Sequence, residues 1–171
     1  MRLYEPSSLD QTVLALIIEQ PRHGFALHKE LDSDESLSSV MRVRRPLVYR
    51  AINSLLEAQY IRPSKVEPGD QGSARTVYTA TASGKRANQQ WLNEVVTHPR
   101  DARIELLCKF VLRSRQGLSN TILARRQREA FSKIAVDLKK SAKQPDVGAQ
   151  LVAQWRYETV NAMVRVLQSV K

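Results

Sequence analysis

The apolar positions near the start of the chain recur at helical spacing and predict two helices. The first covers about residues 9–19, and either Ser8 or Asp10 can serve as its N-cap. The segment 20–24 contains Pro and Gly and ends this helix. A short second helix follows over residues 25–31, and its inward-facing residues are Phe25, either Leu27 or His28, and Leu31.

A third amphipathic helix is predicted over about residues 46–58, because Pro46 suits a first helical position. Its apolar face consists of Leu47, Val48, Ala51, Ile52, Leu55 and Leu56. Its other face carries Tyr49, Arg50 and Asn53, directly after Arg44 and Arg45. The acidic, serine-rich residues 32–39 precede it, and we expect a polar connection there.

After this helix, the spacing of the apolar residues changes from that of a helix to that of a strand. Two β-rich segments within residues 61–80 flank a tip with Gly and Pro at residues 67–73, which predicts a β-hairpin with a long loop. A fourth helix, capped by Thr81 or Ser83, covers about residues 82–96, with Ala87, Trp91, Leu92, Val95 and Val96 on its apolar side. Three helices, a hairpin and a helix follow one another in the order of a winged helix-turn-helix.

The remaining chain has the pattern of an all-helical segment that begins near residues 98 and 99. One helical stripe consists of Ile104, Leu107, Cys108, Val111 and Leu112, and residues 114–119 interrupt it. A longer helix has its stripe at Leu123, Gln127, Ala130, Phe131, Ile134 and Leu138, and residues 144–146 end it. Its opposite face is basic, with Arg125, Arg128, Lys133, Lys139 and Lys140.

The last predicted helix, about residues 147–170, is apolar over a wider arc than the single stripe of an ordinary surface helix. We therefore expect it to pack against its own chain and against a second subunit, through Val152, Trp155, Thr159, Met163, Val166 and Leu167. The fold class predicted is mainly α with a small β-hairpin wing. Residues 1–97 would form the winged helix-turn-helix DNA-binding domain, and residues 98–171 a helical dimerisation domain.

The net charge of +10 is unevenly distributed over the 171 residues. Residues 1–41 hold 3 basic and 7 acidic groups, residues 42–86 hold 9 and 3, and residues 87–171 hold 15 and 7. The densest basic stretch is Arg42, Arg44, Arg45 and Arg50. A basic patch attracts polyanions, although a basic run is also compatible with an ordinary solvated helix face.

These charges fall where a winged helix meets DNA, namely the third helix and the hairpin. The predicted contacts to double-stranded DNA are Arg44, Arg45, Tyr49, Arg50, Asn53, Lys65 and Arg75. Arginine and asparagine suit base edges, and a tyrosine hydroxyl suits a phosphate. We assign Arg44 and Arg45 to phosphates rather than bases. Lys65 and Arg75 would enter a minor groove or grip the backbone, unless they are ordinary surface cations of the hairpin.

Several other classes of function lack support in the sequence. The chain has no nucleophile elbow, P-loop, zinc-protease motif or Rossmann fingerprint, so we expect neither an enzyme nor a cofactor. The three histidines are scattered and predict no metal site. No export signal or membrane-length apolar run is present, and a single cysteine, Cys108, fits a reducing cytoplasm. We interpret Cys108 as a small buried hydrophobe, with a redox sensor as the alternative.

Three motifs resemble the PadR family of winged-helix transcriptional regulators. They are Leu14-Ala15-Leu16 followed by residues 23–29 (HGFALHK), residues 48–55 (VYRAINSL) and residues 77–85 (VYTATASGK). The resemblance covers about residues 9–96, and the later residues 98–110 and 154–157 are similar to the longer members. It implies a homodimeric, sequence-specific regulator of a pseudo-palindromic operator, most often a repressor relieved by a small molecule.

Two features depart from the family pattern. Gln59 stands where the family usually has Gly after the third helix, and residues 32–43 are longer than the usual link. Trp91 and Trp155 either border an effector pocket between the two halves or belong to the core. The alternative function is a non-enzymatic adaptor that has the winged-helix fold and docks an acidic protein partner.

Overall fold

The computed structural model describes residues 4–68, 74–141 and 146–170. The N-terminal elements are α1 (Ser8–Glu19), β1 (Arg22–His23), α2 (Gly24–Ser33), α3 (Glu35–Val40), α4 (Arg45–Glu57), β2 (Ile61–Pro68), β3 (Ala74–Ala80) and α5 (Ala82–Asn93). The elements that follow are α6 (Pro99–Asp101), a π-helical turn η2 (Ala102–Leu106), α7 (Leu107–Arg115), α8 (Thr121–Ser141) and α9 (Val147–Gln168).

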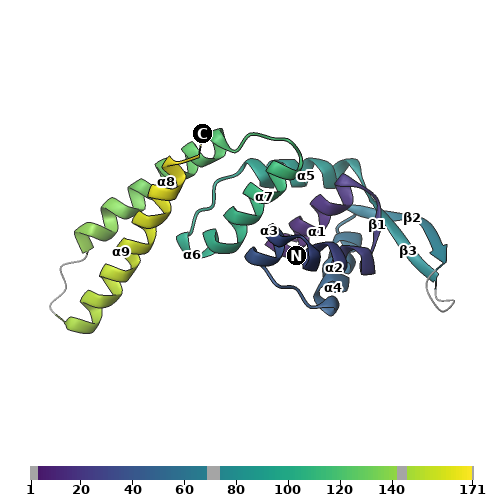
Figure 1. Cartoon of the computed structure of the whole chain (residues 1–171), viewed down its shortest axis with the longest axis horizontal. Coiled ribbons are helices and arrows are strands. Elements are labelled where there is room, and N and C mark those ends of the chain that lie inside the picture. Colours follow the sequence, from purple (N-terminus) through teal and green to yellow (C-terminus); the bar gives the residue numbers. More distant parts are fainter. Residues whose placement is uncertain (1–3, 69–73, 142–145, 171) are drawn as a thin grey trace.

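The molecule is elongated, with the wing and the last two helices at opposite ends (Figure 1). Strands β2 and β3 project at one end, α8 and α9 lie side by side at the other, and the N-terminal helices fill the middle. The mainly α fold class with an N-terminal winged helix-turn-helix is confirmed. The residues between β2 and β3, including the predicted Gly/Pro tip from residue 69, lie outside the described residues, as do residues 144 and 145.

Helix α1 is the centre of the first hydrophobic core. Its segment 13–17 is buried on every side, and it is packed by Leu27, Leu31, Val48 and Ile52 among others. The helix starts at Ser8, one residue before its predicted start, because its N-cap is Ser7 rather than Ser8 or Asp10. Ser7 and Asp10 form a capping box, in which the Asp10 amide donates to the Ser7 hydroxyl (3.2 Å) and the Ser7 amide to the Asp10 carboxylate (2.9 Å).

A second hydrophobic core joins α8 and α9 to the segment that follows α5. It contains Val96, Ala102, Leu106, Leu123, Ala124, Phe131, Ala135, Val160 and Leu167. Cys108 and Leu112 of α7 belong to the first core instead. Phe110 of the same helix packs against the second core, so α7 connects the two cores. The division of the chain at residue 97 stays a prediction.

The structure also corrects predictions about four elements after α1. The polar connection contains α3, because Asp34 caps it by accepting a hydrogen bond from the Leu37 amide (2.9 Å) while the Leu37 side chain is buried. The sheet has a third strand, β1, which pairs with β3 in the order β1-β3-β2. Helix α5 ends at Asn93 rather than at residue 96.

The fourth correction concerns the stripe around α7, where Ile104 and Leu107 are exposed instead of buried. The π-helical turn η2 precedes α7, and its wider turn shifts the register of the residues before the helix. Two cations that the apolar pattern did not include, Lys109 and Arg113, are buried on the inward side of α7.

Candidate nucleic-acid interface

One face of α4 presents all of its predicted DNA contacts to solvent. Val48, Ala51, Ile52 and Leu55 are buried in the first core, which fixes the rotation of the helix about its axis. The opposite face therefore points outward, and it carries the exposed residues Arg44, Arg45, Tyr49, Arg50 and Asn53. Leu47, which was predicted to face the core, is also exposed, because it lies at the edge of this outer face.

The first turn of α4 concentrates positive charge at the positive end of a helix dipole. Arg44 is the N-cap and makes no side-chain capping hydrogen bond, and Arg45 and Pro46 follow as the first helical residues. Acidic or hydroxyl side chains usually stabilise this position, whereas cations are unfavourable there. Cations at a helix N-terminus destabilise the helix, and residues that reduce stability in this way are typical of a site that binds an external anion.

The wing adds two more predicted contacts. Lys65 lies on β2 beyond an irregularity between Pro63 and Lys65, and its ammonium group is 2.7 Å from the Glu67 carboxylate. The hydrogen bond from Lys65 is the main cause that lowers the pKa of the Glu67 carboxyl. An exposed ion pair of this kind is weak, so Lys65 remains able to exchange its partner for a phosphate. Arg75 is half-buried on β3, opposite Glu67 in the sheet.

The turn from α4 to the wing depends on Gln59, which has a positive φ of 56°. Its carbonyl accepts hydrogen bonds from the hydroxyls of Thr81 (2.8 Å) and Ser83 (3.2 Å). Gly84 lies so close to this turn that an added Cβ would be 2.1 Å from the Tyr60 carbonyl oxygen. Gln59 thus adopts the left-handed conformation that usually requires a glycine. The resulting turn sets the angle between α4 and the wing.

The residues His23, Gly24 and Phe25 join α2, α4 and β3, and none of them is among the predicted DNA contacts. His23 pairs with Val77 across the sheet and caps α2, since its Nδ1 accepts from the Ala26 amide (3.1 Å). Gly24 admits the Tyr49 ring, because a Cβ there would be 2.6 Å from a ring carbon. A basic cleft of about 390 Å³ lies here between α4 and the wing. The sequence signal for this junction is the HGF motif itself.

The predicted dimerisation residues divide into three groups on α9. Val152, Trp155 and Val166 are exposed, and Trp155 is 76% exposed. Thr159 and Met163 are half-buried, whereas Leu167 is buried in the second core. Val147 and Leu151 extend the exposed apolar row toward the start of the helix.

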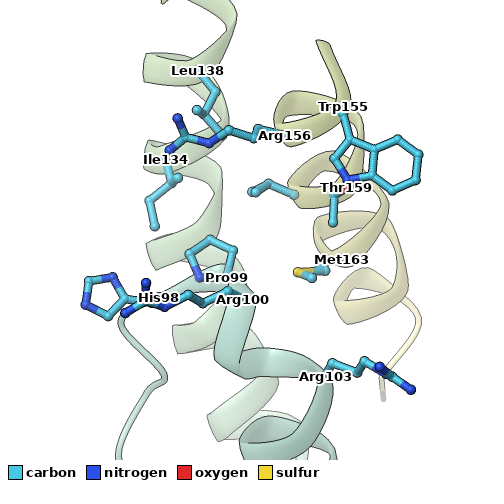
Figure 2. Close-up of a pocket in the computed structure, with 11 residues that line it drawn as sticks. His98, Pro99, Arg100, Arg103, Ile134, Leu138, Trp155, Arg156, Thr159 and Met163 are labelled. Atoms are coloured by element: carbon cyan, nitrogen blue, oxygen red, sulfur yellow. The ribbon is translucent and has the colours of Figure 1, made fainter. Parts of the chain in front are cut away.

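A cleft of about 710 Å³ opens beside this row, between α8, α9 and the segment before α7 (Figure 2). Its apolar lining comes from Ile134, Leu138, Trp155, Val160 and Met163. Its basic lining comes from His98, Arg100, Arg103 and Arg156. Figure 2 shows that Ile134 and Leu138 come from α8, and that Trp155, Thr159 and Met163 come from α9.

The two tryptophans lie in different environments. Trp91 is 9% exposed in the first core, and the Nζ atom of the buried Lys109 lies 5.0 Å from its ring centroid. Lys109 also donates to the Glu94 carbonyl (2.9 Å) and to the Glu105 carboxylate (2.6 Å). These contacts make Trp91 part of the packing that holds α7, while Trp155 lines the 710 Å³ cleft.

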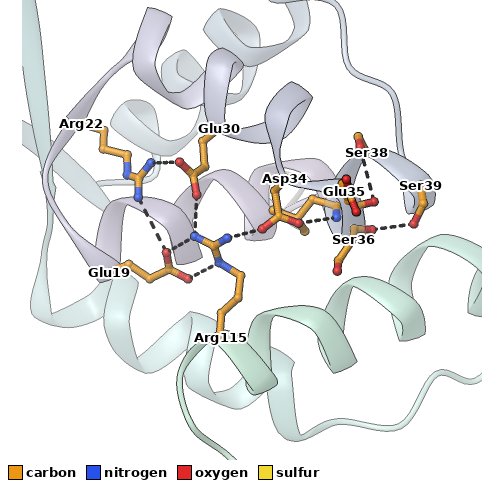
Figure 3. A network of polar contacts seen from close by, with 10 residues as sticks. Glu19, Arg22, Glu30, Asp34, Glu35, Ser36, Ser38, Ser39 and Arg115 are labelled. Atoms are coloured by element: carbon orange, nitrogen blue, oxygen red, sulfur yellow. Dashed lines mark hydrogen bonds and ion pairs between the residues drawn. The ribbon is translucent and has the colours of Figure 1, made fainter.

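Arg115 at the end of α7 ties that helix to α1, α2 and the start of α3 (Figure 3). Its guanidinium binds both oxygens of Glu19 (2.9 and 2.7 Å), Glu30 (2.7 Å) and Asp34. Arg22 donates to the same Glu30 carboxylate (2.7 Å). The hydrogen bonds from Arg22 and Arg115 lower the pKa of the Glu30 carboxyl from its ordinary value of 4.5. The network therefore joins α1, α2 and the start of α3 to α7.

Within residues 4–68, 74–141 and 146–170, no three His, Cys, Asp or Glu side chains come together as a metal-binding group. In the same described part of the chain, every helix is too short or too polar to span a membrane.

Residues 13–90 match the sequence model of the transcriptional regulator PadR-like family. No curated protein matches the chain. Among solved structures, Bacillus subtilis PadR in complex with operator DNA is similar, with a TM-score of 0.50 and 21% identity, over 96% of this chain and 97% of that chain. A further crystal structure of Bacillus subtilis PadR has a TM-score of 0.45 and 20% identity, over 99% and 96% of the two chains. At this identity the likeness concerns the fold.

Proposed function

We propose, from the match of residues 13–90 to the transcriptional regulator PadR-like family model, that the chain is a sequence-specific DNA-binding regulator of that family rather than an enzyme. The observation that carries the proposal is the exposed face of α4, on which Arg44, Arg45 and Arg50 stand beside Tyr49 and Asn53. A helix with this face fits the major groove, where arginine recognises guanine and asparagine recognises adenine. The similar PadR of Bacillus subtilis was crystallised with operator DNA.

The contacts divide by position along α4 and the wing. Arg44 and Arg45, at the uncapped end of α4, suit phosphates, because backbone N–H groups and the helix dipole attract the same anion. Arg50 and Asn53 lie farther along the outer face and suit base edges. Lys65 and Arg75 on the wing suit the backbone or minor groove beside the half-site.

The active form in this proposal is a homodimer joined through α9. The support is the exposed row of Val147, Leu151, Val152, Trp155 and Val166, which is longer than the scattered apolar residues of an ordinary surface. Two copies would present two α4 helices to a pseudo-palindromic operator, with half-sites about one helical turn apart or a multiple of it. The protein should therefore sediment as a dimer, and a monomer at micromolar concentration would contradict this part of the proposal.

The regulatory part of the proposal is repression in the cytoplasm, relieved by a small molecule. Its support is the family resemblance together with the 710 Å³ cleft, which combines an apolar floor with arginines. The cleft adjoins the proposed dimer surface at Trp155, Thr159 and Met163. A ligand held there would alter the spacing of the two DNA-binding halves.

A gel-shift titration over a range of salt concentrations tests DNA binding, using a duplex that the protein selects from a random-sequence library. Binding should weaken steeply with salt, because arginines displace counterions from phosphates. Arg50→Ala should weaken binding to the selected duplex by about 1–3 kcal/mol and binding to random DNA by less. Arg125→Ala on α8 removes the same charge from an exposed site and serves as the control.

Equal affinity for selected and random duplexes would contradict sequence-specific regulation. That result, together with salt-sensitive binding to an acidic protein, would favour the adaptor function instead.

A further inference from the structure

Phe25, at the start of α2, contacts one arginine of α4 and one of the wing. Its ring centroid lies 5.1 Å from the guanidinium carbon of Arg45 and 5.1 Å from that of Arg75. The His23 ring stacks beside it at 6.3 Å between centroids. Phe25 is 38% exposed and lines the cleft between α4 and β3. The ring is therefore placed at the surface, against cations, rather than in the hydrophobic core.

Two guanidinium groups that converge on one site repel each other. The negative face of an aromatic ring attracts a cation within about 6 Å, so one ring offsets the repulsion between two. A guanidinium over a ring keeps N–H donors in its own plane for a second partner such as phosphate. Contact with Phe25 and contact with DNA are thus compatible for the same arginine.

The backbone around Phe25 is fixed with respect to both elements that carry the arginines. His23 pairs with Val77 of β3, and its Nδ1 closes the first turn of α2 through the Ala26 amide. Gly24 packs directly on the Tyr49 ring of α4. The ring consequently sits at a defined distance from α4 and from β3.

We infer that Phe25 is a positioning residue for DNA binding: it holds Arg45 and Arg75 together so that α4 and the wing engage the DNA backbone as one unit. The inference rests on the proposed DNA-binding function. It assigns a role to a side chain that lies outside the predicted contact set. It also predicts that the contributions of Arg45 and Arg75 to binding depend on each other through the ring.

The test compares Phe25→Leu, which keeps an apolar side chain without a π system, with Phe25→Tyr, which keeps the ring. Phe25→Leu should weaken binding to the selected duplex roughly tenfold, because the ring then no longer offsets the repulsion between the two guanidinium groups. Phe25→Tyr should restore binding to within about twofold of the original chain. Tyr4→Leu, which removes another exposed ring, one that lies 6.2 Å from Tyr60, is the matched control.

A double-mutant comparison distinguishes a purely structural role of Phe25 from a role that it exerts through the two arginines. If Phe25 acts through the arginines, Phe25→Leu should have no further effect in a chain that already carries Arg45→Ala and Arg75→Ala. NMR of the free protein gives a second measurement, since ring currents should shift the side-chain proton resonances of Arg45 and Arg75, and Phe25→Leu should abolish these shifts. Absence of these shifts in the original chain would contradict the inference, which therefore stays testable even if Phe25→Leu folds poorly.

Equal binding by the original chain and Phe25→Leu would overturn the inference, and so would a tenfold loss that persists without the two arginines. In both cases the proposed function stands, because the original chain still prefers its selected duplex. If the original chain shows no such preference, the proposed function fails and the inference fails with it.

Discussion

Gln59 takes the backbone through the left-handed region between α4 and β2, where a side chain with a Cβ is strained. Replacement by glycine removes the strain but gives the unfolded chain more freedom. We expect Gln59→Gly to raise the free energy of unfolding by about 0.5–1 kcal/mol, measured by urea denaturation.

Gly117 is the opposite case, because it has a φ of +68° and open space where a Cβ would lie. Gly117→Ala should lower the free energy of unfolding by about 1 kcal/mol in the same measurement.

Cys108 is a second position where a residue-scale property can be measured. Its side chain is fully buried, and burial raises the pKa of the thiol to about 11. Thiolate is the reactive form, so the native protein should react with a thiol reagent near neutral pH far more slowly than the urea-unfolded protein. Rapid labelling of the folded chain would instead support the redox-sensor alternative.

At the scale of elements, the contact between α7 and the helices α1, α2 and α3 depends on carboxylates. The pKa of Glu30 is lowered, so its ionised form stabilises the folded state fully above its ordinary pKa of 4.5. This stabilisation should decline as the pH falls below 4.5, and it is lost once the pH passes the lowered folded-state pKa. Glu30→Gln should therefore be less stable than the original chain at neutral pH and less sensitive to acid.

Urea denaturation between neutral pH and about pH 3 measures this difference. Glu129→Gln removes one charge from an exposed position on α8 and is the control. Parallel stability curves for the original chain and Glu30→Gln would show that the Arg115 network does not hold α7 in place.

Helix α4 shows how far a single buried stripe can be predicted from the sequence. Helix α4 begins and ends within one residue of its predicted bounds, because Val48, Ala51, Ile52 and Leu55 all face one core. Strand β1 and helix α3 were missed because each exists through a distant or capping partner: β1 through β3, and α3 through Asp34. The spacing of apolar residues does not reveal the η2 turn.

The candidate site was predictable to a similar extent. The exposed arginines of α4 follow from helical rotation, since the buried stripe leaves only one outward face. The contacts of Phe25 do not follow, because an aromatic residue at helical spacing is typical of a core position. Its neighbours Arg45 and Arg75 reach it from elements that are far apart in sequence, and only the tertiary structure brings the three together.

At the scale of the whole molecule, α9 should decide whether two copies associate. Trp155→Glu places a charge within the exposed apolar row, where a partner would have to desolvate it. We expect this variant to sediment as a monomer at micromolar concentration and to bind the selected duplex about a hundredfold more weakly, because the second half-site is no longer linked. Gln89→Glu on α5 introduces the same charge elsewhere, and an equal loss in both variants would contradict the dimer.

The contrast between the two tryptophans gives the protein an intrinsic optical reporter. Trp91 is 9% exposed and Trp155 is 76% exposed, so emission from the free chain should combine a blue component with a red one that a soluble quencher such as iodide removes. If the row on α9 is covered when copies meet, dilution should shift the emission maximum to longer wavelength. The assembly equilibrium would then be readable without any label, and Trp155→Phe would show which part of the signal belongs to the interface.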